Sequence, residues 1–143
     1  MKLVVDANIL VAELVRTRGR ALITGARLEL FIADKPWEEA RYELAKRYRA
    51  IAERTGASPE HAAEQHTLAV RLAEASAQVV AQPLYADLER EARRRIPRGP
   101  DDWPTVALAL QLGAAIWTQD GDFLGCGVPT WTTDTLRAQL ERP

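Results

Sequence analysis

Short apolar runs alternate along the chain with longer segments in which apolar residues recur at helical spacing. Residues 3–5 form the first run, which is rich in valine and ends at Asp6. A continuous apolar run of this kind is typical of a strand buried on both faces of a parallel sheet. The same pattern predicts further strands at 28–33, 79–80, 115–118 and 129–132.

Helices are predicted between these strands, over 7–25, 35–54, 58–77, 84–95, 101–113 and from about residue 134 onward. Gly19 marks a weak point within the first helix, and Asp34 is expected to cap the second, with Pro36 in its first turn. Strands that alternate with helices predict an α/β fold. We expect a three-layer α/β/α sandwich with a short central parallel sheet, formed by a single domain of residues 1–143.

Composition narrows the classes of protein that fit. No apolar stretch approaches the roughly 20 residues that a membrane span requires. The first residues also lack the long apolar run of an export signal. The single cysteine, Cys126, excludes an internal disulfide and fits a reducing compartment. A cytoplasmic protein without a membrane partner is therefore expected.

The net charge of −1 at pH 7 means that bulk charge does not indicate a nucleic-acid partner. The densest basic run ends in Arg94, Arg95 and Arg98, and it leads into the acidic pair 101–102. These arginines could hold RNA phosphates. The alternative is a solvated helix face balanced by neighbouring glutamates. A second basic group of the same kind consists of Arg16, Arg18 and Arg20.

Acidic residues follow the predicted strands or open the helices beside them. They are Asp6, Glu38, Glu39, Glu43, Asp101, Asp102, Asp120 and Asp122. Because the carboxyl ends of parallel strands meet at one edge of a sheet, these carboxylates are expected to gather there. A single aspartate at a helix start is often only a cap, but gathered carboxylates repel one another unless a cation lies between them. Such sites suit Mg²⁺ or Mn²⁺, which predicts metal-dependent phosphoryl chemistry.

Two motifs give the chain a family resemblance. The first is Val-Val-Asp-Ala-Asn-Ile-Leu at 4–10, and the second is Thr-Gln-Asp-Gly-Asp-Phe at 118–123, preceded by Asp-Asp-Trp-Pro-Thr at 101–105. In this order and separation they resemble the motifs of PIN-domain ribonucleases, in particular the toxins of VapBC-like toxin–antitoxin pairs. The resemblance covers nearly the whole chain. It implies an endoribonuclease that uses Mg²⁺ or Mn²⁺, forms a homodimer and binds a cognate antitoxin.

The resemblance also implies roles for individual residues. Asp6, Asp102 and Asp120 would be catalytic acids that bind the metal, with Asp101 as a competitor for the place of Asp102. Asp122 would assist or bind the metal through water. Asn8 and Thr118 would orient the carboxylates by hydrogen bonds.

The remaining acid is either Glu39 or Glu43. Family spacing counted from the end of the second strand favours Glu39. A helical projection favours Glu43, which lies nearer the edge of the apolar stripe, one turn later on the same side. We choose Glu39 because a residue near the helix start is closer to the strand ends.

Two other classes of protein fit parts of the pattern. One is a catalytically silent PIN-like RNA-binding or scaffold protein, although all the family acids are present. The other is a phosphoryl-accepting receiver domain, which also gathers acids at strand ends. A receiver needs paired acids after its first strand and a lysine late in the chain, and the last lysine here is Lys46.

Overall fold

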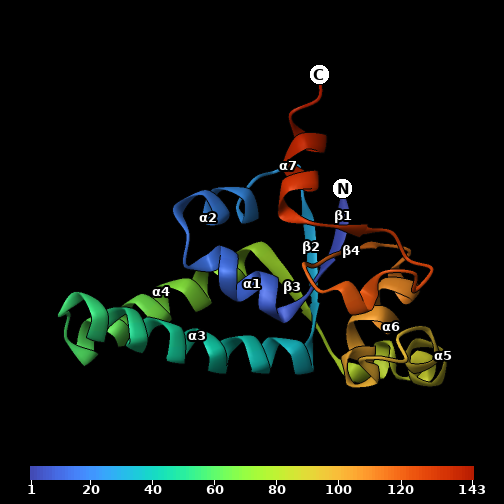
Figure 1. Cartoon of the computed structure of the whole chain (residues 1–143), viewed down its shortest axis with the longest axis horizontal. Coiled ribbons are helices and arrows are strands. Elements are labelled where there is room, and N and C mark those ends of the chain that lie inside the picture. Colours follow the sequence, from blue (N-terminus) through green and yellow to red (C-terminus); the bar gives the residue numbers. More distant parts are fainter.

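A central parallel sheet of five strands organises the molecule, and the computed structural model describes all 143 residues (Figure 1). The strands are β1 (Lys2–Val5), β2 (Glu29–Ala33), β3 (Ala77–Val80), β4 (Ala115–Trp117) and β5 (Thr130–Trp131). They lie in the order β3-β2-β1-β4-β5. Receiver domains have the order 2-1-3-4-5, so the receiver hypothesis is wrong.

Helices cover both faces of the sheet, which confirms the three-layer α/β/α architecture (Figure 1). They are α1 (Ala7–Leu14), α2 (Thr17–Ile23), α3 (Asp34–Thr55), α4 (Pro59–Ser76), α5 (Glu89–Arg95), α6 (Trp103–Leu112) and α7 (Thr133–Leu140). Alternate residues of β1 enter different cores. Leu3 and Val5 pack in a cluster with α1, α3 and α4, whereas Val4 packs in a second cluster with α6. All three side chains are fully buried, as the apolar run predicted.

The segment predicted as one helix over 84–95 is broken into shorter pieces. Two 3₁₀ turns, Gln82–Leu84 and Ala86–Leu88, precede α5. Two further 3₁₀ turns, Pro100–Asp102 and Gly121–Phe123, carry acidic residues of both C-terminal motifs. Tyr85, which lies between the first two of these turns, is only 1% exposed.

The first predicted helix also divides at a different residue from the one expected. Gly19 lies inside α2, and the break falls at Val15 and Arg16. A side chain at position 19 would collide with Glu13, since a Cβ atom there would overlap the Glu13 carbonyl oxygen and lie 2.6 Å from Glu13 Cα. Gly19 is therefore present because α2 packs closely against the backbone of α1, and it does not end a helix.

Asp34 was expected to cap α3, but it is the first residue of that helix and Ala33 occupies the cap position. Its carboxylate instead joins α3 to the segment after β3. Tyr85 Oη donates to Asp34 Oδ1 over 2.5 Å, and the Gln82 amide donates to Oδ2 over 3.0 Å. These contacts fix the start of α3, the helix that carries Glu39.

Helices α3 and α4 form a hairpin that projects from one side of the sheet (Figure 1). The turn between them contains Gly56, whose φ of +76° is the left-handed conformation that favours glycine. At its other end α4 passes directly into β3, from Ser76 to Ala77, with no connecting loop. No helix of the protein combines the length and apolar character needed to cross a bilayer.

We expect Asp34→Ala to destabilise the fold. Burial would raise the pKa of Asp34, but hydrogen bonds from Tyr85, Gln82 and Lys35 outweigh it and lower that pKa below its usual value. The stabilisation is therefore present above the unfolded-state pKa near 4 and is lost as the pH falls through the lower folded-state pKa. At pH 7 the variant should lose about 1–2 kcal/mol in the free energy of unfolding.

Urea unfolding of Asp34→Ala and of the wild type between pH 3 and pH 7 measures this loss. Asp87→Ala, which removes an exposed aspartate from a nearby turn, is the matched control. A difference between wild type and Asp34→Ala that stays constant over this pH range would contradict the assignment.

Candidate functional site

The order of the strands creates a switch point between β1 and β4. The chain proceeds outward from β1 through β2 to β3 and then returns to β4 on the other side of β1. In open α/β sheets, ligands bind at such a point, beyond the carboxyl ends of the strands. The register pairs Val5 with Trp117, so Asp6 and Thr118, the residues that follow, lie side by side.

A chain of hydrogen bonds connects three of the predicted site residues through Thr118. The Thr118 hydroxyl donates to Asp6 Oδ2 over 2.9 Å and accepts the Asp120 amide over 3.0 Å. Asp120 Oδ1 in turn accepts the Asp122 amide over 2.9 Å. Thr118 is 4% exposed and is held by β4, so it fixes the Asp6 carboxylate against the loop that carries the other two acids.

Asp6 itself is only 8% exposed. Burial raises its pKa above the usual value, and the charge of Asp120 acts in the same direction. The Thr118 hydroxyl and the backbone amides of Asn8 and Ala7 at the start of α1 oppose this rise. A buried carboxylate with several donors on one side and acids on the other has the environment of a cation ligand.

Asp102 belongs to the same cluster. Partial burial and repulsion from four other acids together raise the pKa of Asp102 to about 6. These acids are Asp6, Asp120, Glu39 and Asp122. Gly99 faces this group, since a Cβ there would lie 3.1 Å from Asp122 Oδ2 and 3.4 Å from Asp102 Oδ2. The absence of a side chain at position 99 lets the two carboxylates approach.

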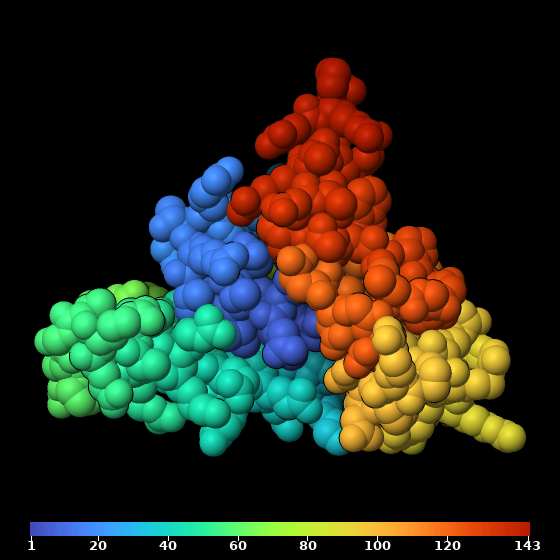
Figure 2. Space-filling model, in the orientation of Figure 1, coloured from blue at the N-terminus to red at the C-terminus, as the bar shows by residue number.

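The sequence left two choices open, Glu39 or Glu43 and Asp102 or Asp101, and the members of each pair differ in their side-chain contacts. Glu39 is close enough to Asp102 to raise its pKa, whereas Glu43 pairs with Lys46 over 3.6 Å. Asp101 has a fully exposed side chain and pairs with Arg93 over 3.4 Å. The structure therefore places Glu39 beside Asp102, whereas Glu43 lines a cavity of about 280 Å³ together with Glu39 and Asn8. Figure 2 shows the start of α1, the start of α3 and the segment near residue 120 meeting at one surface.

Asn8 and the three arginines predicted to bind RNA differ in the contacts that they make. Asn8 contributes to the cluster through its backbone, and its side chain is exposed. Arg98 pairs with Asp122 over 3.4 Å and donates to the Gly121 carbonyl, beside the acids. Arg95 is bound to Glu91 and to the Cys126 carbonyl, each over 2.9 Å. Arg94 is bound to the same glutamate.

The donor set of the cluster fits a hard divalent cation. Its candidate ligands are all carboxylates, the type that Mg²⁺ and Mn²⁺ bind. No three of these side chains already converge as closely as the ligands of a bound ion. The repulsion that raises the pKa of Asp102 is relieved by a cation among these groups.

A buried carboxylate that the sequence patterns did not single out lies near this cluster. Glu13 is 2% exposed on α1, and its Oε2 atom has no hydrogen-bond partner. The Thr133 hydroxyl donates to Glu13 Oε1 over 3.2 Å and accepts the Trp117 indole N–H over 3.1 Å. The sequence does contain one signal that could have identified Glu13: it is a charged residue within the apolar stripe of α1, next to Leu14.

Comparisons with known proteins agree with the fold. A family model described as PIN domain matches residues 4–141. The structure resembles that of PAE2754 from Pyrobaculum aerophilum, with a TM-score of 0.67 and 23% identity over 98% of this chain and 89% of that one. It also resembles FitAcB from Neisseria gonorrhoeae, with a TM-score of 0.53 and 18% identity over 90% of this chain and 96% of that one. No curated protein matches the sequence.

We expect Asp102→Asn to stabilise the metal-free protein. Because its folded-state pKa of about 6 lies above the usual value, ionised Asp102 lowers stability above pH 6, and this penalty disappears as the pH falls from about 6 to 4. Asparagine removes the charge, so the free energy of unfolding at pH 7.5 should rise by about 1 kcal/mol, after allowance for solvent screening.

Thermal unfolding in EDTA at pH 7.5 and pH 4.5 measures the effect, with Asp101→Asn as the control because that neighbour is exposed and paired with Arg93. Equal melting temperatures for Asp102→Asn and the wild type at pH 7.5 would argue against crowding of the acids.

Proposed function

Because the chain belongs to the PIN-domain family, we propose that it is an endoribonuclease that hydrolyses RNA phosphodiester bonds with Mg²⁺ or Mn²⁺. The single observation that carries this proposal is the gathering of Asp6, Glu39, Asp102 and Asp120 at the switch point of the sheet. PIN domains are generally nucleases, and no nucleophilic serine, cysteine or histidine is required in this scheme.

The metal ligands in this proposal are Asp6, Glu39, Asp102, Asp120 and Asp122. A divalent cation held there supplies water activation and neutralises charge on the scissile phosphate. Thr118 holds the Asp6 carboxylate in one orientation by its 2.9 Å hydrogen bond. The backbone amide of Asn8, at the start of α1, acts on the same carboxylate by lowering its pKa. Both residues act through Asp6, so they are positioning residues.

RNA contacts are proposed for Arg94, Arg95 and Arg98. Arg98 has the strongest support because it adjoins Asp122 at the edge of the cluster and its side chain is 71% exposed. Arg94 and Arg95 are already paired with Glu91. They can contact an RNA strand only through donors that this pairing leaves free.

On the resemblance of the two motifs to VapBC-like toxins, we further propose that the protein is the toxin of a toxin–antitoxin pair, that it forms a homodimer and that it works in the cytoplasm. A small open reading frame immediately upstream would favour the toxin role. The second candidate function is a silent RNA-binding or scaffold protein, and metal-dependent cleavage separates the two.

We expect purified protein to cleave members of a mixed RNA panel with Mn²⁺ or Mg²⁺ and to cleave none in EDTA. Asp6→Asn should fold normally and lose more activity than the about 10–100-fold that removal of an outer hydrogen-bond partner costs. Asp101→Asn is the matched control and should retain activity. Cleavage by Asp6→Asn at the wild-type rate would refute the assignment of the site.

Thr118→Val should lower the cleavage rate about 10–100-fold, because the valine cannot donate to Asp6. Thr118→Ser keeps the hydroxyl and should recover most of the rate. Initial rates at saturating Mn²⁺, with circular dichroism to verify folding, test this expectation. A serine variant as slow as the valine variant would mean that Thr118 acts by packing alone.

A further inference from the structure

A cavity of about 670 Å³ lies between α1, α2 and α7, and none of the clustered acids lines it. The two sites share short pieces of chain. Gln119, in the cavity wall, lies between Thr118 and Asp120, and Ile9 follows Asn8 on the first turn of α1. The volume lies within the range of sites that bind a small ligand or one unit of a larger one, roughly 300–1,000 Å³.

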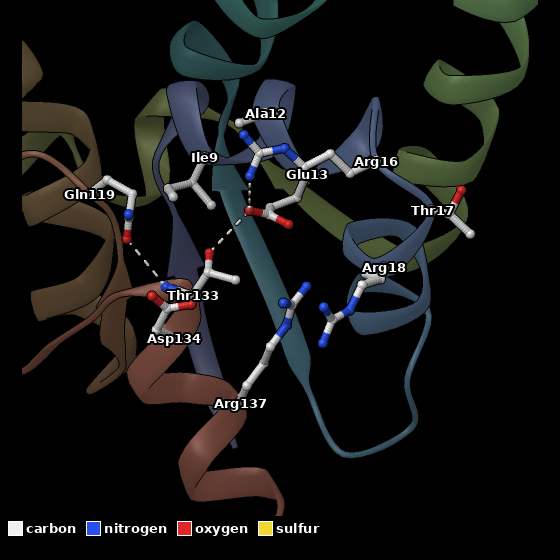
Figure 3. Close-up of a pocket in the computed structure, with 10 residues that line it drawn as sticks. All are labelled: Ile9, Ala12, Glu13, Arg16, Thr17, Arg18, Gln119, Thr133, Asp134 and Arg137. Carbon is white, nitrogen blue, oxygen red and sulfur yellow. Dashed lines mark hydrogen bonds and ion pairs between the residues drawn. The ribbon is translucent and has the colours of Figure 1, made fainter.

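Two arginines in this cavity are free to bind an anion. Figure 3 shows Arg18 of α2 and Arg137 of α7 reaching from opposite walls into the space below the Glu13 carboxylate, with no hydrogen bond or ion pair to the other residues drawn. Arg16 lies on the other side of Glu13 and pairs with it over 3.8 Å. Arg18 and Arg137 also line an adjoining cavity of about 350 Å³, so the groove continues between α2 and α7.

The Glu13 carboxylate gives the upper wall of the cavity its shape. It accepts the Thr133 hydroxyl, attracts Arg16 and leaves Oε2 without a partner beside Gly19. The neighbouring amide of Thr133 is bound by Gln119 Oε1 over 3.3 Å. Asp134 adds a second carboxylate at the rim. Because Glu13 is buried, Asp134 is the carboxylate that the cavity exposes beside its arginines. Cationic groups with an acceptor at the rim suit a nucleotide, which carries both a phosphate and base N–H donors.

We propose that this cavity is a substrate subsite that binds a nucleotide flanking the cleaved bond, with its phosphate held between Arg18 and Arg137. The inference rests on the proposed nuclease function, because it makes the cavity the continuation of an RNA path that crosses the acid cluster. From Asp6 to Leu14 the path follows α1 for about 12 Å at 1.5 Å per residue, and Arg16 lies just beyond the end of that helix. Arg18 and Arg137 are binding residues in this scheme, and Glu13 is a positioning residue that shapes the wall beside them.

The experiment uses Asp6→Asn as a protein that binds RNA without cleaving it. Fluorescence anisotropy with a labelled single-stranded RNA in EDTA gives the affinity of Asp6→Asn alone, with Arg18→Ala/Arg137→Ala added, and with the control pair Arg49→Ala/Arg54→Ala added. The control removes the same charge from exposed positions on α3. The test pair should weaken binding at least about tenfold and reduce the salt dependence of log K by about 0.7, the value for one phosphate of a single strand. The control pair should change neither quantity.

Kinetics and competition complete the test. With Asp6 intact, Arg18→Ala/Arg137→Ala should raise KM for RNA more than it lowers kcat. Equal RNA affinity for the test and control pairs would overturn the subsite. If the wild type cleaves no RNA, the nuclease proposal fails and the subsite fails with it. If the wild type cleaves RNA but Asp6→Asn binds none, the nuclease proposal stands and the subsite fails alone. Binding of adenosine 5′-monophosphate that needs both arginines, with RNA affinity unchanged, would assign the cavity to a free nucleotide and also overturn the proposal.

Discussion

Carboxylates are crowded beyond the carboxyl ends of β1 and β4. They repel one another, and the surrounding structure must compensate for this repulsion. Asp6 is buried there, and the Thr118 hydroxyl donates a hydrogen bond to its carboxylate. The Asp120 carboxylate accepts the Asp122 amide, and Arg98 pairs with Asp122 at the edge. Such a cluster lowers the stability of the fold, which is the usual relation between a charged functional site and the scaffold that holds it.

The fold class could be predicted from the sequence because the short apolar runs mark strands buried on both faces. The acids that follow those runs then had to lie at one edge of the sheet. The strand order could not be predicted in the same way, since pairing of β1 with β4 joins residues more than 100 positions apart. That pairing puts Asp6 beside Thr118 and creates the switch point.

The sequence pattern left the choice between neighbouring acids open because the distance of Glu39 from Asp102 depends on how α3 packs against the sheet. Glu43 pairs with Lys46 and Asp101 pairs with Arg93, whereas Glu39 lies close enough to Asp102 to raise its pKa. Two predictions about helix residues were wrong because those residues make tertiary contacts that the local sequence does not reveal. Gly19 makes room for Glu13, and Asp34 binds Tyr85 from 51 residues away. In each case a tertiary contact determined the role of a residue whose local preference indicated a break or a cap.

The hairpin of α3 and α4 divides this protein into a part that tolerates changes of length and a part that does not. Glu39 lies near the base of α3, and Gly56 lies at the tip, 17 residues later, which is about 25 Å along the helix. Residues inserted at the tip would leave the acids undisturbed, because exposed turns accept insertions. A single residue inserted between Ser76 and Ala77 would rotate α4 against the sheet, since no loop separates them. Divergence among related chains is therefore free to lengthen and reshape the far end of the hairpin, whereas its junction with β3 keeps a fixed length.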